Sequence, residues 1–258
     1  TTAGVSGRRG IAISSSGRRA DFTRSTTSHQ RGKGTVRRAR VVMVLWFHSE
    51  LDDAAAWTAA LARELPDLDV DASPSPRDPA AVRWALVYRP PAGALAAMPR
   101  LEAIFSLAAG VESFLADPTL PDVPLCRMVD PGLTATIADY AHSAVLRSHR
   151  GFDDHARAQA AGRWAFATPK LAGEVTVAVL GLGELGRTVA RRLSAHGYRV
   201  TGWSRGPRTL DGVATHHGAD GLAPAVRDAD VVVALLPATP ATRDLFDAAF
   251  FDAVKPGA

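Results

Sequence analysis

The sequence predicts an α/β protein: a Rossmann-type doubly wound parallel sheet in the C-terminal part, preceded by a smaller flavodoxin-like α/β domain. Short apolar runs alternate with helical stretches from residue 40 onward, a pattern typical of parallel sheets with crossover helices. A glycine-rich turn joins a buried strand to a helix near residue 181. No apolar run approaches the roughly 18 residues of a membrane-spanning helix, so no membrane partner is predicted.

The first 39 residues are predicted to be a disordered basic leader, because they are rich in Ser, Thr, Gly and Arg and lack hydrophobic periodicity. Residues 1–40 carry a net charge of +9, whereas the rest of the chain carries −5. A transit peptide and a phosphate-binding arm share this composition, but an upstream extension or cloning remnant is the preferred interpretation. Because the body is mildly acidic, no nucleic-acid partner is predicted.

The first domain is predicted over residues 40–133. Its first strand spans residues 41–47, and Asp52 or Asp53 caps a helix that runs to Leu65 before Pro66 ends it. Turns that contain Pro or Gly separate the remaining elements. These are strands at 68–72, 84–88, 102–107 and 124–129, and a short helical run at 94–98.

Residues 134–169 are predicted to hold one long helix, from near Thr134 to about Ala161, that connects the domains or forms an oligomer contact. The second domain, residues 170–258, then begins. Its elements are a strand at 176–181, a helix from Glu184 to Ala195 capped by Gly197, strands at 198–203 and 231–237, and a helix at 240–251.

Three glycines, Gly181, Gly183 and Gly186, form a G-x-G-x-x-G pattern between a strand and a helix, with another strand following. The first allows a sharp turn, the second lets the backbone approach a pyrophosphate, and the third lets helix and strand pack closely. The helix start at Glu184 and Leu185 offers unpaired N–H groups to the phosphates. We predict a dinucleotide site here, with a purely structural turn as the alternative.

The residues after the next strand favour NADP(H), with NAD(H) still possible. An NAD site places an acid about 20 residues after the glycines, but this chain has Ser204, Arg205 and Arg208 there and no acid before Asp211. A guanidinium suits a 2′-phosphate because it offers paired donors and a full charge. The alternative is a solvated loop arginine. Further cofactor contacts are predicted, on the nicotinamide side, at Leu236, Pro237 and Thr242.

The run LAAGVES (107–113) follows a strand of the first domain, and its small residues leave backbone N–H groups accessible to a carboxylate. A plain turn is the alternative. Tyr88 and Arg89 are predicted to lie near it. Cys126 is the only cysteine, which excludes an internal disulfide and a cysteine-based metal site and fits a reducing cytoplasm. No metal is predicted, because the histidines lack ligand spacing, and none is assigned to catalysis.

Residues 40–258 resemble the D-isomer-specific 2-hydroxyacid dehydrogenases, and within that family the glyoxylate/hydroxypyruvate reductase A type. Motifs along the whole stretch carry the resemblance in the expected order. They are VYRPP (87–91), IFSLAAGVES (104–113), DPGLTATIADYAHSAVL (130–146), RGFDD (150–154), VLGLGELGRTVA (179–190), GWSR (202–205) and LLPATPATR (235–243).

The resemblance implies an NADP(H)-preferring oxidoreductase that reduces a small 2-oxoacid, such as glyoxylate or hydroxypyruvate, to the D-2-hydroxyacid. It also implies two domains around a cleft, the first being the substrate domain, and a homodimer built partly from the connector helix. Ala109, Gly110 and Val111 match the backbone loop that binds the substrate carboxylate, with Ala108 in place of a more usual Gly. Tyr88 and Arg89 stand where the reductase A group tends to have Trp and His.

In the family, a catalytic Arg, Glu and His lie beyond the segment that matches residues 255–258. The resemblance therefore implies that the chain is C-terminally truncated, with an incomplete second sheet and no catalytic residue of its own. Our leading hypothesis is that the sequence is a C-terminally incomplete version of an active reductase. The alternative is a non-catalytic NAD(P)-binding or interaction protein. A 3-hydroxyacid or imine-reducing enzyme is disfavoured, because those enzymes open with the nucleotide motif.

Overall fold

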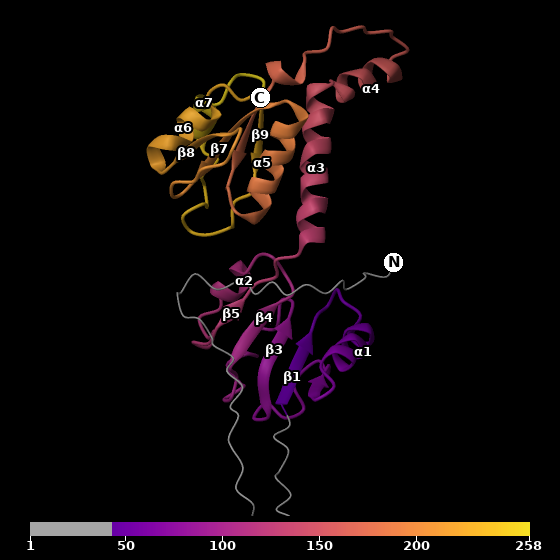
Figure 1. The fold of residues 1–258 in the computed structure, drawn as a ribbon, viewed down its shortest axis with the longest axis vertical. Helices are drawn as coiled ribbons and strands as arrows, with labels where there is room; N and C mark the ends of the chain where they lie inside the picture. Colours follow the sequence, from indigo (N-terminus) through magenta and orange to yellow (C-terminus); the bar gives the residue numbers. More distant parts are fainter. Residues whose placement is uncertain (1–42) are drawn as a thin grey trace, which may run out of the picture. The chain divides into compact units, whose positions relative to one another are not determined.

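The computed structural model describes residues 43–258 and has the α/β architecture that the sequence predicts (Figure 1). The described residues divide into a first unit, which ends at Met128, and a second unit, Val129–Ala258. Each unit holds a parallel sheet with helices. The predicted leader, residues 1–39, lies outside the described residues.

The first unit is a five-stranded parallel sheet in the order β2-β1-β3-β4-β5. Leu45 and Phe47 of β1 face helix α1, whereas Trp46 faces Leu95, Met98 and the short helix α2. The Asp53 carboxylate caps α1 by accepting hydrogen bonds from the backbone N–H groups of Ala55 and Ala56. The elements are β1 Met43–His48, α1 Ala54–Glu64, β2 Leu68–Asp71, β3 Val82–Val87, β4 Ala103–Ser106, α2 Glu112–Leu115 and β5 Leu125–Cys126.

The second unit is a four-stranded parallel sheet in the order β8-β7-β6-β9. One of its two inner strands, β6, is buried along its whole length, as expected for a parallel strand covered on both faces. Gly197 caps α5 with a φ of +105°, as the sequence predicts. The elements are α3 Pro131–His149, α4 Phe152–Ala160, η1 Ala172–Glu174, β6 Thr176–Leu180, α5 Glu184–His196, β7 Arg199–Ser204, β8 Ala214–His217, η2 Ala219–Gly221, α6 Leu222–Val226, β9 Val231–Ala234 and α7 Ala248–Ala253.

The connector predicted as one helix is two helices. Helix α3 begins at Pro131, where the Asp130 carboxylate accepts a hydrogen bond from the backbone N–H of Leu133. It ends before Gly151, whose φ of +61° interrupts the helical backbone and starts α4. Ala141 and Val145 of α3 pack with Val189 of α5, so α3 is part of the core of the second unit (Figure 1).

Three further expectations differ from the structure. The run at 94–98 forms turns rather than a helix. The helix predicted at 240–251 begins only at Ala248, because Asp247 caps it by accepting a hydrogen bond from the N–H of Phe250. Strand β8 and helix α6 were not predicted, since Ala214–His217 has no apolar alternation. Within the described residues, no helix has the length and hydrophobicity needed to cross a membrane.

Candidate functional sites

The three glycines of the second unit occupy positions with different steric demands. Gly181 has a φ of +97°, and a Cβ there would lie 2.5 Å from the Leu235 carbonyl oxygen. A Cβ at Gly186 would overlap the carbonyl oxygen of Gly181. A Cβ at Gly183 would meet nothing within 4 Å. The turn and the packing of α5 on β6 therefore require two of the glycines, while the third keeps an open backbone face.

The start of helix α5 leaves donors available beside that open face. Gly183 is the N-terminal capping residue and no side chain among the described residues caps the helix there, so first-turn N–H groups remain for an anion. The carboxylate of Glu184 would disfavour an anion, but it is paired with Arg187 one turn along. Leu185 is half-buried on the same turn. The geometry is that of a phosphate-binding helix start.

Strand β9 ends against the glycine turn. The backbone N–H of Leu235 donates to the Leu180 carbonyl at 2.8 Å, and Leu236 packs against the core beside Gly181. Pro237 is exposed. The Thr242 hydroxyl contacts the Pro237 carbonyl and accepts a hydrogen bond from the N–H of Thr239. The structure thus uses Thr242 to hold the loop that carries Leu236 and Pro237.

Two exposed arginines, Arg205 and Arg208, follow the carboxyl end of β7. Ser204 is buried, and its hydroxyl donates to the Gly206 carbonyl at 2.8 Å. Arg205 and Arg208 are exposed, and neither guanidinium pairs with a carboxylate among residues 43–258. Two unpaired arginines beside a tight turn can accept a doubly charged phosphate without first breaking an internal ion pair.

The small-residue loop of the first unit follows β4. Ser106 is buried, and its hydroxyl accepts a hydrogen bond from the N–H of Ala108 at 3.1 Å, which folds the loop over the strand end. Ala109 and Val111 are half-buried and Gly110 is exposed. A Cβ at Gly110 would meet the carboxylate of Glu112, the mobile end of a long side chain. The loop does not demand glycine as the dinucleotide turn does.

Tyr88 and Arg89 lie beside this loop, because β3 and β4 are neighbours. The N–H of Leu107 donates to the Val87 carbonyl at 3.0 Å. Arg89 has a φ of +45°, rare for a residue with a side chain, and its guanidinium lies 5.3 Å from the centre of the Tyr88 ring. The structure therefore brings four of the five predicted positions, 88, 89, 109 and 110, to one edge of the sheet, and Val111 follows as the N-terminal capping residue of α2.

His48 is a residue at this edge that the sequence did not single out. It ends β1 opposite Val87, and the N–H of Tyr88 donates to its carbonyl at 2.8 Å. Its Nε2 is buried without a hydrogen-bond partner among the described residues. In the strand order β2-β1-β3, the chain adds β2 on one side of β1 and β3 on the other, so the strand order reverses between β1 and β3. Ligands of α/β sheets bind at the carboxyl ends of the strands at such a point. Knowledge of the strand order would have identified His48 as a site residue, but the strand order could not be predicted from the sequence.

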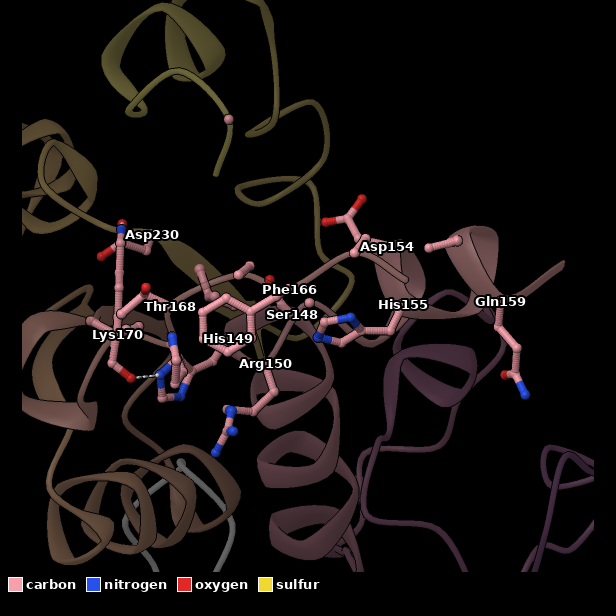
Figure 2. A pocket seen from close by; sticks show the side chains of 18 of the residues that line it. Ser148, His149, Arg150, Asp154, His155, Gln159, Phe166, Thr168, Lys170 and Asp230 are labelled. Atoms are coloured by element: carbon pink, nitrogen blue, oxygen red, sulfur yellow. Dashed lines mark hydrogen bonds and ion pairs between the residues drawn. The ribbon is translucent and has the colours of Figure 1, made fainter. Parts of the chain in front are cut away.

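A cavity of about 1150 Å³ lies elsewhere in the second unit (Figure 2). It is bounded by the end of α3, α4, residues 162–170 and residues 255–258, and it contains no predicted site residue. In its wall, His149 Nε2 donates to the Lys170 carbonyl at 2.8 Å, which leaves Nδ1 to accept from the Tyr198 hydroxyl. The cavity reaches Val175 and Val231 at the amino ends of the strands, whereas the glycine turn follows their carboxyl ends.

Asp230, also in this wall, is a structural carboxylate. Burial by itself would raise its pKa, but hydrogen bonds from Lys255 and from the backbone N–H of Thr176 outweigh that effect and lower the pKa. The Lys255 bond is 2.5 Å and the Thr176 bond is 2.9 Å. Across residues 43–258, no group of three or more His, Cys, Asp or Glu side chains is placed to hold a metal ion.

Comparison with known proteins places these features in context. The family description "D-isomer specific 2-hydroxyacid dehydrogenase, NAD binding domain" matches residues 142–258. The glyoxylate/hydroxypyruvate reductase A of Serratia proteamaculans is 36% identical over 222 residues, which cover 84% of this chain and 71% of that protein. The protein of the same name from Photorhabdus laumondii is 34% identical over 220 residues, covering 83% and 70%.

Solved structures are similar as well. A D-isomer specific 2-hydroxyacid dehydrogenase from Xanthobacter autotrophicus, in complex with NADPH and MES, has a TM-score of 0.80 at 40% identity and covers 84% of this chain and 70% of its own. An NADPH-dependent glyoxylate/hydroxypyruvate reductase from Sinorhizobium meliloti, with NADP and sulfate, has a TM-score of 0.74 at 33% identity and covers 83% and 68%.

Proposed function

Because the chain belongs to the D-isomer-specific 2-hydroxyacid dehydrogenase family, we propose that it binds NADP(H) and a small 2-oxoacid of the glyoxylate or hydroxypyruvate type, for reduction to the D-2-hydroxyacid. The family and the reductase A type expected from the sequence are confirmed by the relatives. The glycine turn carries the proposal, since two of its glycines are sterically required and Gly183 leaves an open backbone face.

The second unit holds the cofactor in this proposal. Gly183 and the N–H groups at the start of α5 receive the pyrophosphate, because within residues 43–258 no side chain caps this helix start and nothing lies within 4 Å of a Cβ at Gly183. Ser204, Arg205 and Arg208 receive the 2′-phosphate that distinguishes NADP(H) from NAD(H). Leu236, Pro237 and Thr242 position the nicotinamide end, where the bound cofactor supplies the hydride.

The first unit orients the 2-oxoacid. Backbone N–H groups of Ala109, Gly110 and Val111 bind the substrate carboxylate, and Tyr88 and Arg89 contact the remainder of the small acid. Reduction adds a hydride to the carbonyl carbon and a proton to its oxygen. We assign that proton donor to no residue of this sequence, so the roles proposed here are binding and orientation.

We also propose a cytoplasmic homodimer that uses the second unit. Large apolar side chains are exposed on α3, on α4 and on the segment after it, among them Tyr140, Phe152, Trp164 and Phe166, and Trp164 is 94% exposed. Light scattering should give twice the mass of one chain. Trp164→Asp should shift the protein to monomers, whereas a monomeric unsubstituted protein contradicts the proposal.

The test of the cofactor is a fluorescence titration with NADPH and with NADH. We expect tighter binding of NADPH, and Arg205→Ala with Arg208→Ala should weaken NADPH about tenfold or more while leaving NADH unchanged. Arg227→Ala, an exposed arginine elsewhere on the second unit, is the matched control. Equal affinity for the two cofactors would overturn the NADP(H) assignment.

The test of the reaction follows NADPH consumption with glyoxylate and with hydroxypyruvate. Consumption supports the reductase. NADPH binding without consumption of either acid supports the second candidate, a non-catalytic NAD(P)-binding protein. Absence of NADPH binding contradicts both.

A further inference from the structure

We propose that His217 is a third member of the 2′-phosphate subsite, beside Ser204 and the two arginines, and that it strengthens the preference for the phosphorylated dinucleotide. The inference rests on the proposed binding of NADP(H). It comes from strand β8, which the sequence did not predict and which brings residues 216–218 to the end of β7.

The strand register places His217 at the subsite. Strands β7 and β8 are parallel, with Trp203 paired with His216 and Ser204 paired with His217. Residues paired in this way carry their side chains on the same face, and successive residues alternate between faces. His217 therefore shares the face of Ser204, whereas His216 shares the face of Trp203, which packs into the apolar core.

Hydrogen bonds lock the two strand ends together. The N–H of Gly218 donates to the Ser204 carbonyl at 3.2 Å, and the indole N–H of Trp203 donates to the Gly218 carbonyl at 2.8 Å. His217 directly precedes Gly218, so these two bonds to Gly218 set the position of its backbone relative to Ser204.

The loop that carries Arg208 is fixed to the same face of β8. The Thr215 hydroxyl donates to the Arg208 carbonyl at 2.7 Å. Thr215 lies two residues before His217, so both side chains are on one face of the strand. The β7–β8 register and this bond thus hold the backbone at Ser204, Arg208 and His217 in one region at the carboxyl ends of the two strands.

The imidazole of His217 is available to a ligand. The residue is exposed, and its ring makes no hydrogen bond or ion pair within residues 43–258. His149 differs, because both of its ring nitrogens are engaged by Tyr198 and Lys170. An imidazole offers an N–H donor whether neutral or charged, and a phosphate offers several acceptor oxygens. Arg205 and Arg208 add positive charge and form no ion pair with a carboxylate within residues 43–258, so a dianion suits the site.

The experiment compares ligands that differ only in the 2′-phosphate: 2′,5′-ADP against 5′-AMP, and NADPH against NADH. Calorimetric titration of His217→Ala should show 2′,5′-ADP and NADPH weakened about fivefold to tenfold, with 5′-AMP and NADH unchanged. His217→Arg should restore or exceed the original affinity for the phosphorylated ligands, and His217→Glu should weaken them further than alanine does.

The matched control is His216→Gln, on the same strand but the opposite face, and it should leave all four affinities unchanged. Unchanged binding of NADH and 5′-AMP also reports that the variants are folded. If the original protein prefers NADPH but His217→Ala binds it equally well, the inference fails and the proposed function stands. If the original protein shows no preference for NADPH, both fail.

Discussion

The glycine turn of the second unit and the small-residue loop of the first occupy equivalent places, each directly after a strand of a parallel sheet. They differ in what their backbones require. Gly186 is confined by the carbonyl oxygen of Gly181, which cannot move without shifting the helix from the strand. Gly110 is confined only by the side chain of Glu112, which can rotate away. A motif can be recognised in a sequence when the backbone geometry allows only one residue type at its key positions.

The largest effect expected from this comparison is at Gly186. Gly186→Ala should destabilise the protein by about 3 kcal/mol, because the new methyl overlaps backbone and forces α5 off β6. Urea unfolding followed by circular dichroism measures it. Gly183→Ala is the control: stability should stay within about 0.5 kcal/mol, while NADPH binding weakens. Comparable loss of stability in both variants would contradict the distinct roles of the two glycines.

The next effect tests a carboxylate of the first unit. Asp71 is buried, which alone would raise its pKa, but hydrogen bonds from Ser73 and Arg77 lower it to about 2. Because the folded value lies below the unfolded one, this stabilisation is present above about pH 4 and is lost as the pH falls toward 2. Asp71→Asn should cost about 2 kcal/mol at pH 7 and little at pH 2.

Asp69→Asn is the control for this measurement, since Asp69 is exposed on the same strand. It should change stability little at either pH. A cost for Asp71→Asn that stays constant from pH 7 to pH 2 would show that the carboxylate charge contributes nothing to stability.

A smaller effect is expected on the acid sensitivity of stability in the second unit, and it depends on His142. Burial, together with the nearby His196, lowers the pKa of His142 on α3. The ring centres of the two histidines are 4.5 Å apart, and His142 also faces Tyr198. Of the charged groups near this contact, Asp139 of α3 is paired with Arg192 of α5.

A histidine with a lowered pKa favours folding above its ordinary value of 6.5, and that contribution is lost as the pH falls. His142→Phe should therefore make thermal stability less sensitive to acid between pH 7 and pH 5. His155→Phe, at an exposed position on α4, should leave the pH profile unchanged. Identical profiles for the original protein and His142→Phe would refute this account of the α3–α5 contact.

The smallest effect is at Gly110. Gly110→Ala should change stability by less than about 0.5 kcal/mol, because Glu112 can move aside. Gly93→Ala should cost about 1 kcal/mol in the same unit, since Gly93 has a φ of +76°. Thermal unfolding of the two variants makes the comparison. A larger loss at Gly110 than at Gly93 would mean that the carboxylate loop is as constrained as the dinucleotide turn.

The sequence predicted most where local rules act strongly. The class of fold, a cap at Asp52 or Asp53, the burial of residues 176–180 and the helix from Glu184 to the cap at Gly197 all follow from short-range patterns, and the structure then selects Asp53. These features need no knowledge of which strands become neighbours.

The failures arose where tertiary contacts decide. Strand β8 carries Ala-Thr-His-His and has only β7 as a partner among the described residues, so its sequence lacks the apolar alternation of a half-buried strand. The separation of α3 from α4 depends on a positive φ at Gly151, and the helical pattern of the sequence does not reveal that the helix is interrupted at this glycine. The place of His48 beside Tyr88 depends on strand order.

Every strand pair within residues 43–258 is parallel, and this affects how the chain folds while it is being synthesised. Among these strands no hairpin can form early, because parallel neighbours require a long crossover. Val177 of the buried strand β6 pairs with Val231, which the ribosome adds much later. Until then an apolar segment has no partner on one side, and such segments are bound by chaperones or aggregate. Production of the protein should therefore respond to growth temperature and chaperone supply more than its final stability would suggest.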